Sequence, residues 1–492
     1  MSRADDIEPL NPTILEQSTM NQVVWFRQDL RIHDHIALSE AAERGPVIAL
    51  YVLTPTQWKQ HGDAPAKVDF WLRALSSLSQ SLLSLNIPLK ILHVDTYAQV
   101  PDAIVSSCKE WKVTTLHCHR EQGVNERRRD RATYQALAQH GIDMVGYDGN
   151  TLLSPGSVKT GAEAYYRVFT PFSRACRALL RSAPLRLRSA PSVQKIAAGL
   201  PSSDPVPACL PDWPKMDPEM VRRWPATESA AASRLQSFCD RAIAKYDQQR
   251  DFPAVDGTSI LSPYLAAGLL SPSQCLHAAM AANRGEMDTG HKGVVTWINE
   301  LLWREFYMHL MHGFPQLSMH QPMRPETIAV QWREDVGGFQ AWCEGRTGVP
   351  IVDAAMRQLL ATGWMHNRLR MVVAMFLTKN LLIDWRQGEA FFMRYLIDGE
   401  LCANNGGWQW SASTGADSAP YFRVFNPVSQ SEKFDPDGVF IKHWVPELAS
   451  VSSREIHDPD AQLRRKLGYP EMMVDLKSSR LRAIEAFKRI SA

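Results

Sequence analysis

Five short apolar runs, separated by amphipathic stretches, fill residues 22–150, and this alternation constrains the fold more than any other feature. The apolar runs are 22–26, 47–53, 89–94, 113–118 and 142–147, and the main amphipathic stretches are 64–85, 97–109 and 123–140. Near-continuous apolar strands separated by helices are typical of a parallel sheet covered on both faces. We therefore expect a doubly wound, Rossmann-like α/β domain that binds ligands at the carboxyl ends of its strands.

The rest of the chain has a different pattern. From about residue 226 onward the sequence is helical almost throughout, which predicts an all-helical domain at 226–492. Residues 151–225 are rich in Pro, Ser and Arg and have poor periodicity, so we expect an interdomain linker there. Residues 1–21 are expected to form a short N-terminal extension, which leaves 22–150 as the α/β domain.

Composition excludes several classes of protein. No apolar run approaches the ~20 residues of a membrane helix. Residues 22–150 contain no GxGxxG and no GxxxxGK[ST], which disfavours a dehydrogenase or a P-loop ATPase. The eight cysteines lack CxxC or metal-ligand spacing, so we expect reduced thiols, no metal site and a cytoplasmic location. Because the net charge is only +2, a polyanionic partner requires a local basic face.

Two helical segments carry polar and aromatic residues on one face. Helical spacing places Trp297, Glu300, Arg304 and Tyr307 on one face, with Trp303 beside it. These residues could grip a planar polar ligand, or Glu300 and Arg304 could form an ion pair beside core tryptophans. In 365–380, Asn367, Arg370 and Met371 share a face with Ala374; alternatively, Met371 fills a core gap and Arg370 is solvated. Both interpretations stay open for each segment.

Two further segments suit a ligand site. Residues 398–410 combine two acids, two amides, a double glycine and two tryptophans, and glycine allows close approach of the backbone to a ligand. Residues 257–262 offer three hydroxyls and a glycine at a predicted helix start, which suits either a phosphate or ordinary helix capping.

Together these segments resemble the photolyase/cryptochrome family, most closely the bacterial class I cyclobutane pyrimidine dimer photolyases. The resemblance spans about 22–480 and is carried by WFRQDLR at 25–31, YDQQRDFPAV at 246–255, WMHNRLRM at 364–371 and DGELCANNGGWQW at 398–410. It implies a light-driven lyase in which excited reduced FAD passes an electron to a dimer flipped out of DNA and splits it. No metal is implied.

The resemblance also assigns residues. It implies FAD contacts at Tyr246, Thr258, Ser259, Ile260, Leu261, Ser262, Trp297, Glu300, Arg304, Asn367, Arg370, Asp398, Gly399, Glu400 and Asn404. Lesion and DNA contacts fall on Arg250, Glu300, Trp303, Asn367, Arg368, Met371 and Trp410. The catalytic set is Glu300, Asn367, Met371 and Asn404, and the electron-transfer set that reduces the flavin is Trp332, Trp385 and Trp408.

Three positions separate this chain from other branches. The 6-4 photolyases carry His at the positions of Asn367 and Met371, and plant cryptochromes carry Asp at the position of Asn404. A 6-4 photolyase and a blue-light sensor that binds FAD without repair are therefore the alternatives. We expect a cytoplasmic monomer that acts on UV-damaged DNA and has no membrane partner.

The antenna chromophore has a partial signature. Asn125 and Glu126 match the folate contacts of the bacterial enzymes, whereas Ser318-Met319 replaces the Cys-Lys pair expected from the helical domain. This replacement removes a cation that could bind the folate's carboxylates. The resemblance favours 5,10-methenyltetrahydrofolate; the alternatives are a deazaflavin, another antenna chromophore or no antenna.

Overall fold

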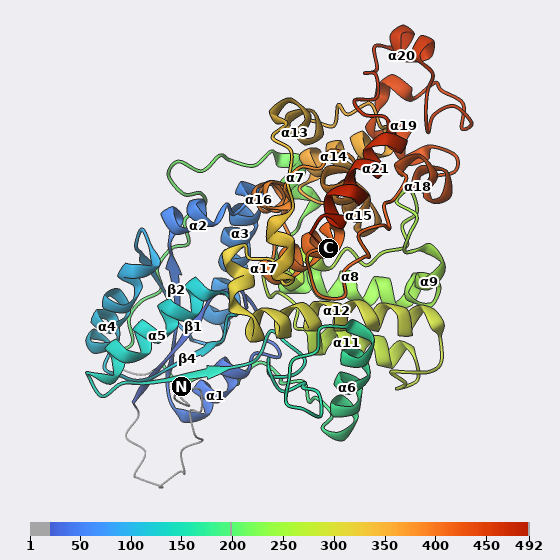
Figure 1. Cartoon of the computed structure of the whole chain (residues 1–492). Helices are drawn as coiled ribbons and strands as arrows, with labels where there is room; N and C mark the ends of the chain where they lie inside the picture. The colour runs from blue at the N-terminus through green and yellow to red at the C-terminus, as the bar shows by residue number, and fades with distance from the viewer. Residues whose placement is uncertain (1–19, 197–198, 491–492) are drawn as a thin grey trace.

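The computed structural model describes residues 20–196 and 199–490, so most of the predicted extension 1–21 lies outside the described residues (Figure 1). An α/β domain is packed against one side of a larger helical domain. This arrangement confirms the predicted fold class.

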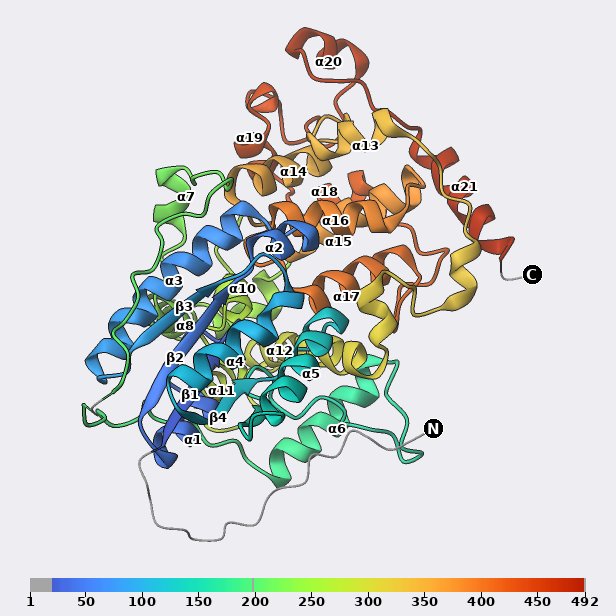
Figure 2. The ribbon, with the colours of Figure 1, turned by 90° about the vertical axis from the view of Figure 1, so that its left-hand side faces the viewer.

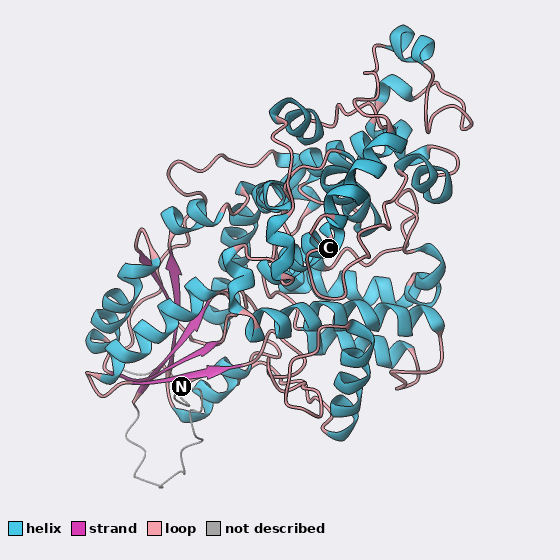
Figure 3. Ribbon diagram, viewed as in Figure 1, coloured by secondary structure: helices cyan, strands magenta, loops and turns pink. Residues whose placement is uncertain are grey.

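A five-stranded parallel sheet forms the centre of the α/β domain (Figure 3). Its strands are β1 (Asn21–Phe26), β2 (Val47–Leu53), β3 (Leu89–His93), β4 (Val113–His119) and β5 (Asp143–Tyr147), in the order β3-β2-β1-β4-β5. The order reverses direction between β1 and β4. In doubly wound sheets the crevice at the carboxyl ends of such strands is the usual ligand site.

Alternate residues of the strands enter two different cores. Val24 and Phe26 of β1 face a core shared with α1 (Ile36–Arg44) and α3 (Pro65–Ser84). Val23 and Trp25 face a second core that includes α4 (Val100–Glu110) and α5 (Val124–Ala138). Because both faces are covered at the centre of the sheet, β2 and most of β1 are apolar without interruption, which explains the near-continuous runs there in the sequence.

The predicted linker region contains regular structure at both ends. Helix α6 (Phe169–Ser182) packs on α12 (Lys292–Gly313), and α7 (Pro218–Arg223) is a short helix near the far end. The described residues of 183–217 form no helix or strand; backbone hydrogen bonds from Gln194 and Asp204 tie them to the segment before β3 and to its first residue. The apolar face of α6 is obscured in the sequence by Pro171 and its arginines.

Short and long helices build the helical domain around α12. They are α8 (Glu228–Arg241), α9 (Tyr246–Gln249), α10 (Ser262–Ala266), α11 (Pro272–Ala282), α13 (Val336–Cys343), α14 (Pro350–Thr362), α15 (Asn367–Met375), α16 (Trp385–Tyr395), α17 (Leu401–Ala412), α18 (Pro427–Phe434), α19 (Val439–Trp444), α20 (Ala461–Leu467) and α21 (Leu476–Lys488). A π-helical turn, Phe376–Asn380, follows α15. Among the described residues, no helix has the length and apolar character needed to cross a bilayer.

Helix ends place the site segments. Gly363 ends α14 in the left-handed conformation, with φ of 67°, so that the chain can reverse into α15. Glu400 caps α17 by accepting hydrogen bonds from the N–H groups of Cys402 (2.9 Å) and Ala403 (2.8 Å). The motifs at 364–371 and 398–410 therefore open two neighbouring helices, α15 and α17.

Buried hydrogen bonds join the two domains. The carboxylate of Glu305, in the middle of α12 and fully buried, accepts the backbone N–H groups of Leu152 and Leu153, both at 2.9 Å, and so fixes the segment that directly follows the α/β domain. From the α/β domain, Arg31 donates to the carbonyl of Gly268 (3.0 Å) and Lys67 donates to that of Gly399 (2.5 Å). The domain interface is therefore specific and polar as well as apolar.

Candidate flavin and antenna cavities

A cavity of about 470 Å³, here called the central cavity, lies within the helical domain. Helices α12, α15 and α17 form much of its wall, together with the segment 258–262 before and at the start of α10. All the residues predicted to contact FAD line it, and so do Arg250, Trp303, Met371 and Trp410. The structure thus brings together four segments that are far apart in the sequence.

Hydroxyl groups gather along one part of the central cavity. The indole of Trp297 donates to Ser259 Oγ (3.3 Å), and the indole of Trp364 donates to Ser262 Oγ (3.2 Å). Ile260, between the two serines, has φ of 48°, which is costly for a β-branched residue. Strained backbone of this kind clusters at ligand sites, where the surrounding structure enforces it.

The α12 face predicted from helical spacing points into the central cavity. Glu300 does not pair with Arg304; its Oε1 lies 2.5 Å from Nη1 of Arg250, which comes from the end of α9. Burial raises the pKa of Glu300, and Arg250 opposes this rise. Trp303 stacks on Phe169 with ring centroids 3.8 Å apart. The ligand-binding interpretation of this face is therefore favoured over an intrahelical ion pair.

A guanidinium and a carboxylate face each other on the opposite wall. Arg370 Nη2 lies 2.8 Å from Asp398 Oδ2, and its Nε donates to the carbonyl of Met365 (2.9 Å). Asn404 donates to the carbonyl of Glu389 (3.0 Å). Two residues that line the cavity each carry one buried polar atom, Asp398 Oδ1 and Trp408 Nε1, that has no hydrogen-bond partner among the described residues. Buried groups of this kind are normally satisfied, so they indicate a polar ligand.

Three residues of the predicted set lie outside the central cavity. Arg368 donates to Asp251 Oδ1 (2.7 Å) and lies over the ring of Phe434. Trp385 is buried at the start of α16, and Trp332 is partly exposed beside Phe487, at a centroid distance of 6.0 Å. Trp408 lines the cavity and packs so closely on α16 that a Cβ at Gly388 would lie 2.1 Å from its ring.

Sequence reasoning missed several aromatic walls of the central cavity. Trp364 and Phe392 line it but were not predicted as site residues, and Tyr307, which helical spacing placed on the face of Glu300 and Arg304, was given no role. Tyr307 follows Trp303 by one turn of α12, so the helical spacing that selected Glu300 and Arg304 contained the signal. Phe392 has no such signal, since an apolar residue of a buried helix is normally core.

A second cavity of about 420 Å³, here called the interdomain cavity, opens between the two domains. It lies at the carboxyl ends of β1, β2 and β4, where the strand order reverses, and Asn125, Glu126, Ser318 and Met319 line it as the antenna prediction requires. Its wall is shared with the central cavity: Leu265, Ala266, Arg304 and Glu400 line both.

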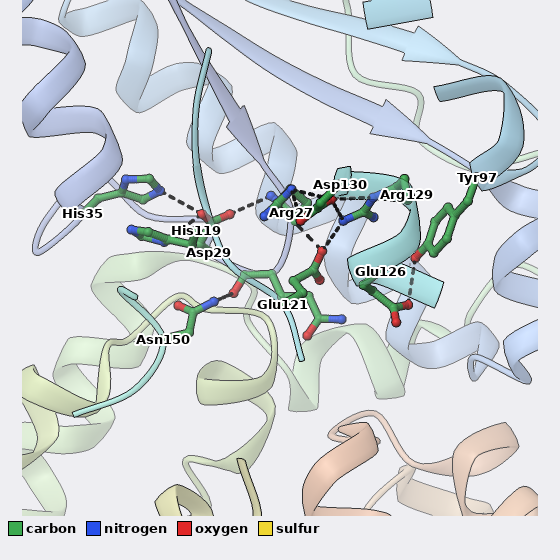
Figure 4. Close-up of polar contacts among 11 residues, drawn as sticks. Arg27, Asp29, His35, Tyr97, His119, Glu121, Glu126, Arg129, Asp130 and Asn150 are labelled. Carbon is green, nitrogen blue, oxygen red and sulfur yellow. Dashed lines mark hydrogen bonds and ion pairs between the residues drawn. The ribbon is translucent and has the colours of Figure 1, made fainter. Parts of the chain in front are cut away.

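Paired charges fill the sheet side of the interdomain cavity (Figure 4). Arg27 and Arg129 both contact Asp130 and Glu121, and Tyr97 donates to Glu126 Oε1 (3.2 Å). Burial raises the pKa of Glu126, and the nearby Glu121 adds to the rise. Burial therefore favours the protonated form of the Glu126 carboxyl, which makes hydrogen bonds to protein groups in place of water.

A buried cluster of Asp29, His35 and His119 lies beside this network (Figure 4). His35 Nδ1 accepts the N–H of Leu38 (3.0 Å), so its proton is on Nε2, which donates to Asp29 Oδ2 (3.1 Å). A nitrogen that carries a proton cannot ligate a metal. The cluster therefore stabilises the turn after β1 through hydrogen bonds.

Comparison with known proteins identifies the family. The model for the FAD-binding domain of DNA photolyase matches residues 297–489, and the DNA photolyase model matches 22–192. The deoxyribodipyrimidine photo-lyase of Escherichia coli strain K12 is 45% identical over 95% of this chain and 98% of its own length. The chain belongs to the DNA photolyase family.

Other family members agree with this assignment. The deoxyribodipyrimidine photo-lyase of Neurospora crassa is 40% identical over 98% of this chain and 85% of its own length. A crystal structure of a class III photolyase from Agrobacterium tumefaciens superposes with a TM-score of 0.85 at 34% identity, covering 99% of this chain and 100% of that one. A Synechocystis cryptochrome superposes with a TM-score of 0.83 at 28% identity, covering 96% and 100%.

The central cavity of this photolyase-family chain suits FAD. Its apolar and aromatic walls fit a flavin ring, and Arg370 and Asn404 in its lining offer a guanidinium and an amide to polar groups of the ring. Hydroxyls of 258–262 lie where a phosphate-bearing tail could reach them. FAD is accordingly the cofactor of the helical domain, as the family model states.

Proposed function

We propose that this chain is a light-driven DNA repair enzyme that splits cyclobutane pyrimidine dimers in UV-damaged DNA. The observation that carries the proposal is the central cavity, where Glu300, Trp303 and Trp410 share one space with the expected flavin shell. Relatives named deoxyribodipyrimidine photo-lyase, matched over nearly the whole chain, support the same activity.

The flavin, when reduced and excited by light, supplies the electron that opens the cyclobutane ring, and the electron then returns to it. Arg370, oriented by Asp398, holds positive charge at the flavin side of the central cavity. Asn404 is fixed by its bond to the Glu389 carbonyl and presents its amide to the same space. Protein groups of this kind tune a flavin's electronics, while the chemistry belongs to the cofactor.

Trp303 and Trp410 supply the surfaces on which the extruded lesion stacks. Photolyases are among the enzymes that flip their target out of the duplex, and poorly paired lesions cost less to flip. Stacking of a base on an aromatic side chain is worth ~1–3 kcal/mol. Glu300, held by Arg250, is positioned to accept a hydrogen bond from a pyrimidine N–H.

Two arginines serve the DNA backbone in this proposal. Arg250 borders the central cavity, and Arg368 lies outside it on the first turn of α15. Each has an acidic partner, Glu300 and Asp251 respectively, so phosphate binding by either competes with an ion pair. Because the contacts are electrostatic, DNA affinity should fall as salt rises.

Trp408, Trp385 and Trp332 are proposed to pass electrons inward when the flavin is oxidised. The placement of Trp408 in the cavity wall, Trp385 on the adjacent helix and Trp332 near the surface supports an inward order. The interdomain cavity is proposed to hold 5,10-methenyltetrahydrofolate at Asn125 and Glu126. A monomeric state and a cytoplasmic location stay predictions; the absence of a disulfide among the eight cysteines, all of them described, agrees with the latter.

The alternatives lack a supporting observation. Asn367 and Met371 stand where 6-4 photolyases have His, and Asn404 stands where plant cryptochromes have Asp. Asn367, Met371 and Asn404 all line the central cavity, so the differences fall in the site itself.

The test is repair of a thymine-dimer oligonucleotide by purified, FAD-containing, reduced protein under blue light and in the dark. We expect dimer loss only in the light. Binding of the lesion without repair would contradict the proposal and favour a sensor, whereas repair of a 6-4 photoproduct in its place would favour the 6-4 enzyme.

A further inference from the structure

Most of the charged side chains that line the interdomain cavity neutralise one another. Arg27 and Arg129 are held by Asp130 and Glu121, as described above. On other sides, Lys67 Nζ lies 2.6 Å from Asp63 and Arg120 Nη1 lies 3.0 Å from Asp148. A ligand anion that recruited any of these cations would leave a carboxylate unpaired, which is costly where the pair is buried.

Among the described residues lining this cavity, three lysines or arginines make no ion pair: Lys59, Arg304 and Arg394. Arg304 is already used, because it donates to the carbonyl of Asn150 (2.7 Å) and also lines the central cavity. Lys59 and Arg394 are exposed. They are therefore the cations that an anionic group in this cavity can recruit without breaking an ion pair.

Lys59 and Arg394 come from different domains but flank the same turn. The carbonyl of Lys59 accepts the N–H of Gly62 (3.1 Å), the left-handed residue that ends α2 (Pro55–His61). A Cβ at Gly62 would lie 3.6 Å from Cγ of Arg394 on α16. Helices α2 and α16 lie side by side in both views (Figures 1 and 2). Docking of the domains thus brings two cation-bearing segments together at the mouth of the cavity, where Lys59 Nζ lies 5.9 Å from the ring centroid of Trp213.

The residue before Gly62, His61, links this turn to polar groups that can accept or donate hydrogen bonds. His61 Nε2 faces amide nitrogens of Asn125 (3.1 Å) and Gln57 (3.0 Å), so it accepts, and the ring proton lies on Nδ1, 3.6 Å from Glu126 Oε1. Glu126 is thus an acceptor in the lining of the cavity, suited to a ring that presents N–H groups. Ser318 Oγ accepts the N–H of Val124 (3.2 Å), which places Ser318 beside the start of α5, the helix that carries Asn125 and Glu126.

Met319 and His320 lie against the same helix that carries Arg394. His320 Nδ1 is 3.0 Å from Glu389 Oε2, and Arg394 follows Glu389 by five residues of α16, or ~7.5 Å along the helix axis. Arg394 can therefore supply the positive charge that is absent at Met319, at a position that an extended ligand tail can reach.

We propose that Lys59 and Arg394 bind the carboxylate tail of a reduced folate whose pterin ring contacts Asn125 and Glu126. This inference rests on the proposed antenna function and names its anion-binding residues. A phosphate-bearing flavin fits less well, because the arginines at the ends of the strands are already bound to Asp130 and Glu121.

The test uses full-length, FAD-containing protein and two ligands: 5,10-methenyltetrahydrofolate and its pteroate analogue, which lacks the glutamate tail and carries its benzoyl carboxyl group as an uncharged amide. Wild type should bind the folate more tightly than the pteroate. In the double variant Lys59→Ala/Arg394→Ala, folate affinity should fall by about tenfold, since two partly exposed ion pairs are lost, while pteroate affinity stays unchanged. Added salt should reduce the folate advantage of wild type.

Lys109→Ala, which removes an exposed cation of α4 outside both cavities, is the matched control and should bind both ligands as wild type does. Equal loss of both ligands in the double variant, or no loss of either, would overturn the proposal. Binding of a deazaflavin but not folate by wild type would overturn it as well. The prereduced double variant should repair dimers as well as wild type does under light that FAD absorbs directly. If neither protein repairs dimers, the result counts against the proposed function and not against the folate-binding residues.

Discussion

The two cavities are similar in volume but differ in how they are built. The central cavity is lined by the helical domain alone, and its charges are few: the Glu300–Arg250 and Arg370–Asp398 pairs, with Arg304 and Glu400. The interdomain cavity takes side chains from both domains and is rich in paired charges. The central cavity is therefore a mainly apolar enclosure within one domain, whereas the shape of the interdomain cavity depends on how two surfaces dock.

The largest effect should come from a wall of the central cavity. Trp408→Phe keeps an aromatic ring but removes the readily oxidised indole, so light-driven reduction of oxidised flavin should fall by more than about tenfold, equivalent to at least ~1.4 kcal/mol on the barrier. Prereduced enzyme should still repair dimers. Flavin absorption during illumination measures the first effect.

Trp342→Phe is its control, because Trp342 is buried and lies 6.0 Å from Trp408 by ring centroids without belonging to the proposed set. Normal photoreduction in Trp408→Phe, or equal loss in both variants, would contradict the assignment of the route.

A smaller effect is expected at Glu300. Glu300→Gln keeps the shape but removes the charged acceptor, so repair per absorbed photon should fall about fivefold, the equivalent of one hydrogen bond of ~1 kcal/mol. DNA affinity should change little, because Arg250 is released for phosphate.

The pH dependence of repair separates charge from shape at this position. Burial raises the pKa of Glu300, so wild-type repair should decline as pH falls through that raised value, while Glu300→Gln should show no such decline. Parallel pH profiles in the two proteins would show that the carboxylate charge has no part in repair.

The interdomain cavity should respond to a charge placed at its rim. Met319→Lys adds a cation where the bacterial pattern has one, and should raise folate affinity about threefold, as expected for a partly exposed ion pair. In the Lys59→Ala/Arg394→Ala background the same substitution should recover part of the lost affinity. The molar ratio of folate to FAD after reconstitution measures folate binding by the single variant and by the triple variant. A rise in folate affinity that does not depend on salt would argue against an ionic cause.

The smallest effect concerns stability. Because burial raises the pKa of Glu126 above its unfolded value, the stability linked to this group is greatest at low pH and is lost as pH rises through the folded pKa. Glu126→Gln should therefore raise the melting temperature of folate-free protein by about 2 °C at pH 8 and by less at pH 5, while weakening folate binding. Thermal melts at the two pH values provide the measurement; equal shifts would exclude the titration as the cause.

The difference between the cavities also explains what the sequence could predict. The strands were predicted to within two residues, because burial on both faces leaves an uninterrupted apolar run. The central cavity was largely predictable because its residues belong to contiguous motifs and helix faces, as for Trp297, Glu300 and Arg304. Helix α6 was missed because arginines and a proline interrupt its apolar face.

Lys59 and Arg394 had no local signature. Each is an exposed cation on an ordinary helix, and its position at the cavity mouth exists only after the two domains dock. The unpartnered Asp398 Oδ1 is likewise invisible in sequence, because hydrogen-bond satisfaction depends on the whole surrounding fold.

The buried hydrogen bonds of Glu305 bear on how efficiently excitation energy could pass between the two cavities. Separating the domains would strand its buried carboxylate and the N–H groups of Leu152 and Leu153, and each buried group left unsatisfied costs ~1–3 kcal/mol or more. The distance and relative orientation of the central cavity and the proposed antenna cavity are therefore set when the chain folds. Because radiationless energy transfer depends steeply on both quantities, the efficiency with which an antenna passes its excitation to the flavin is a built-in constant of this fold rather than an average over moving domains.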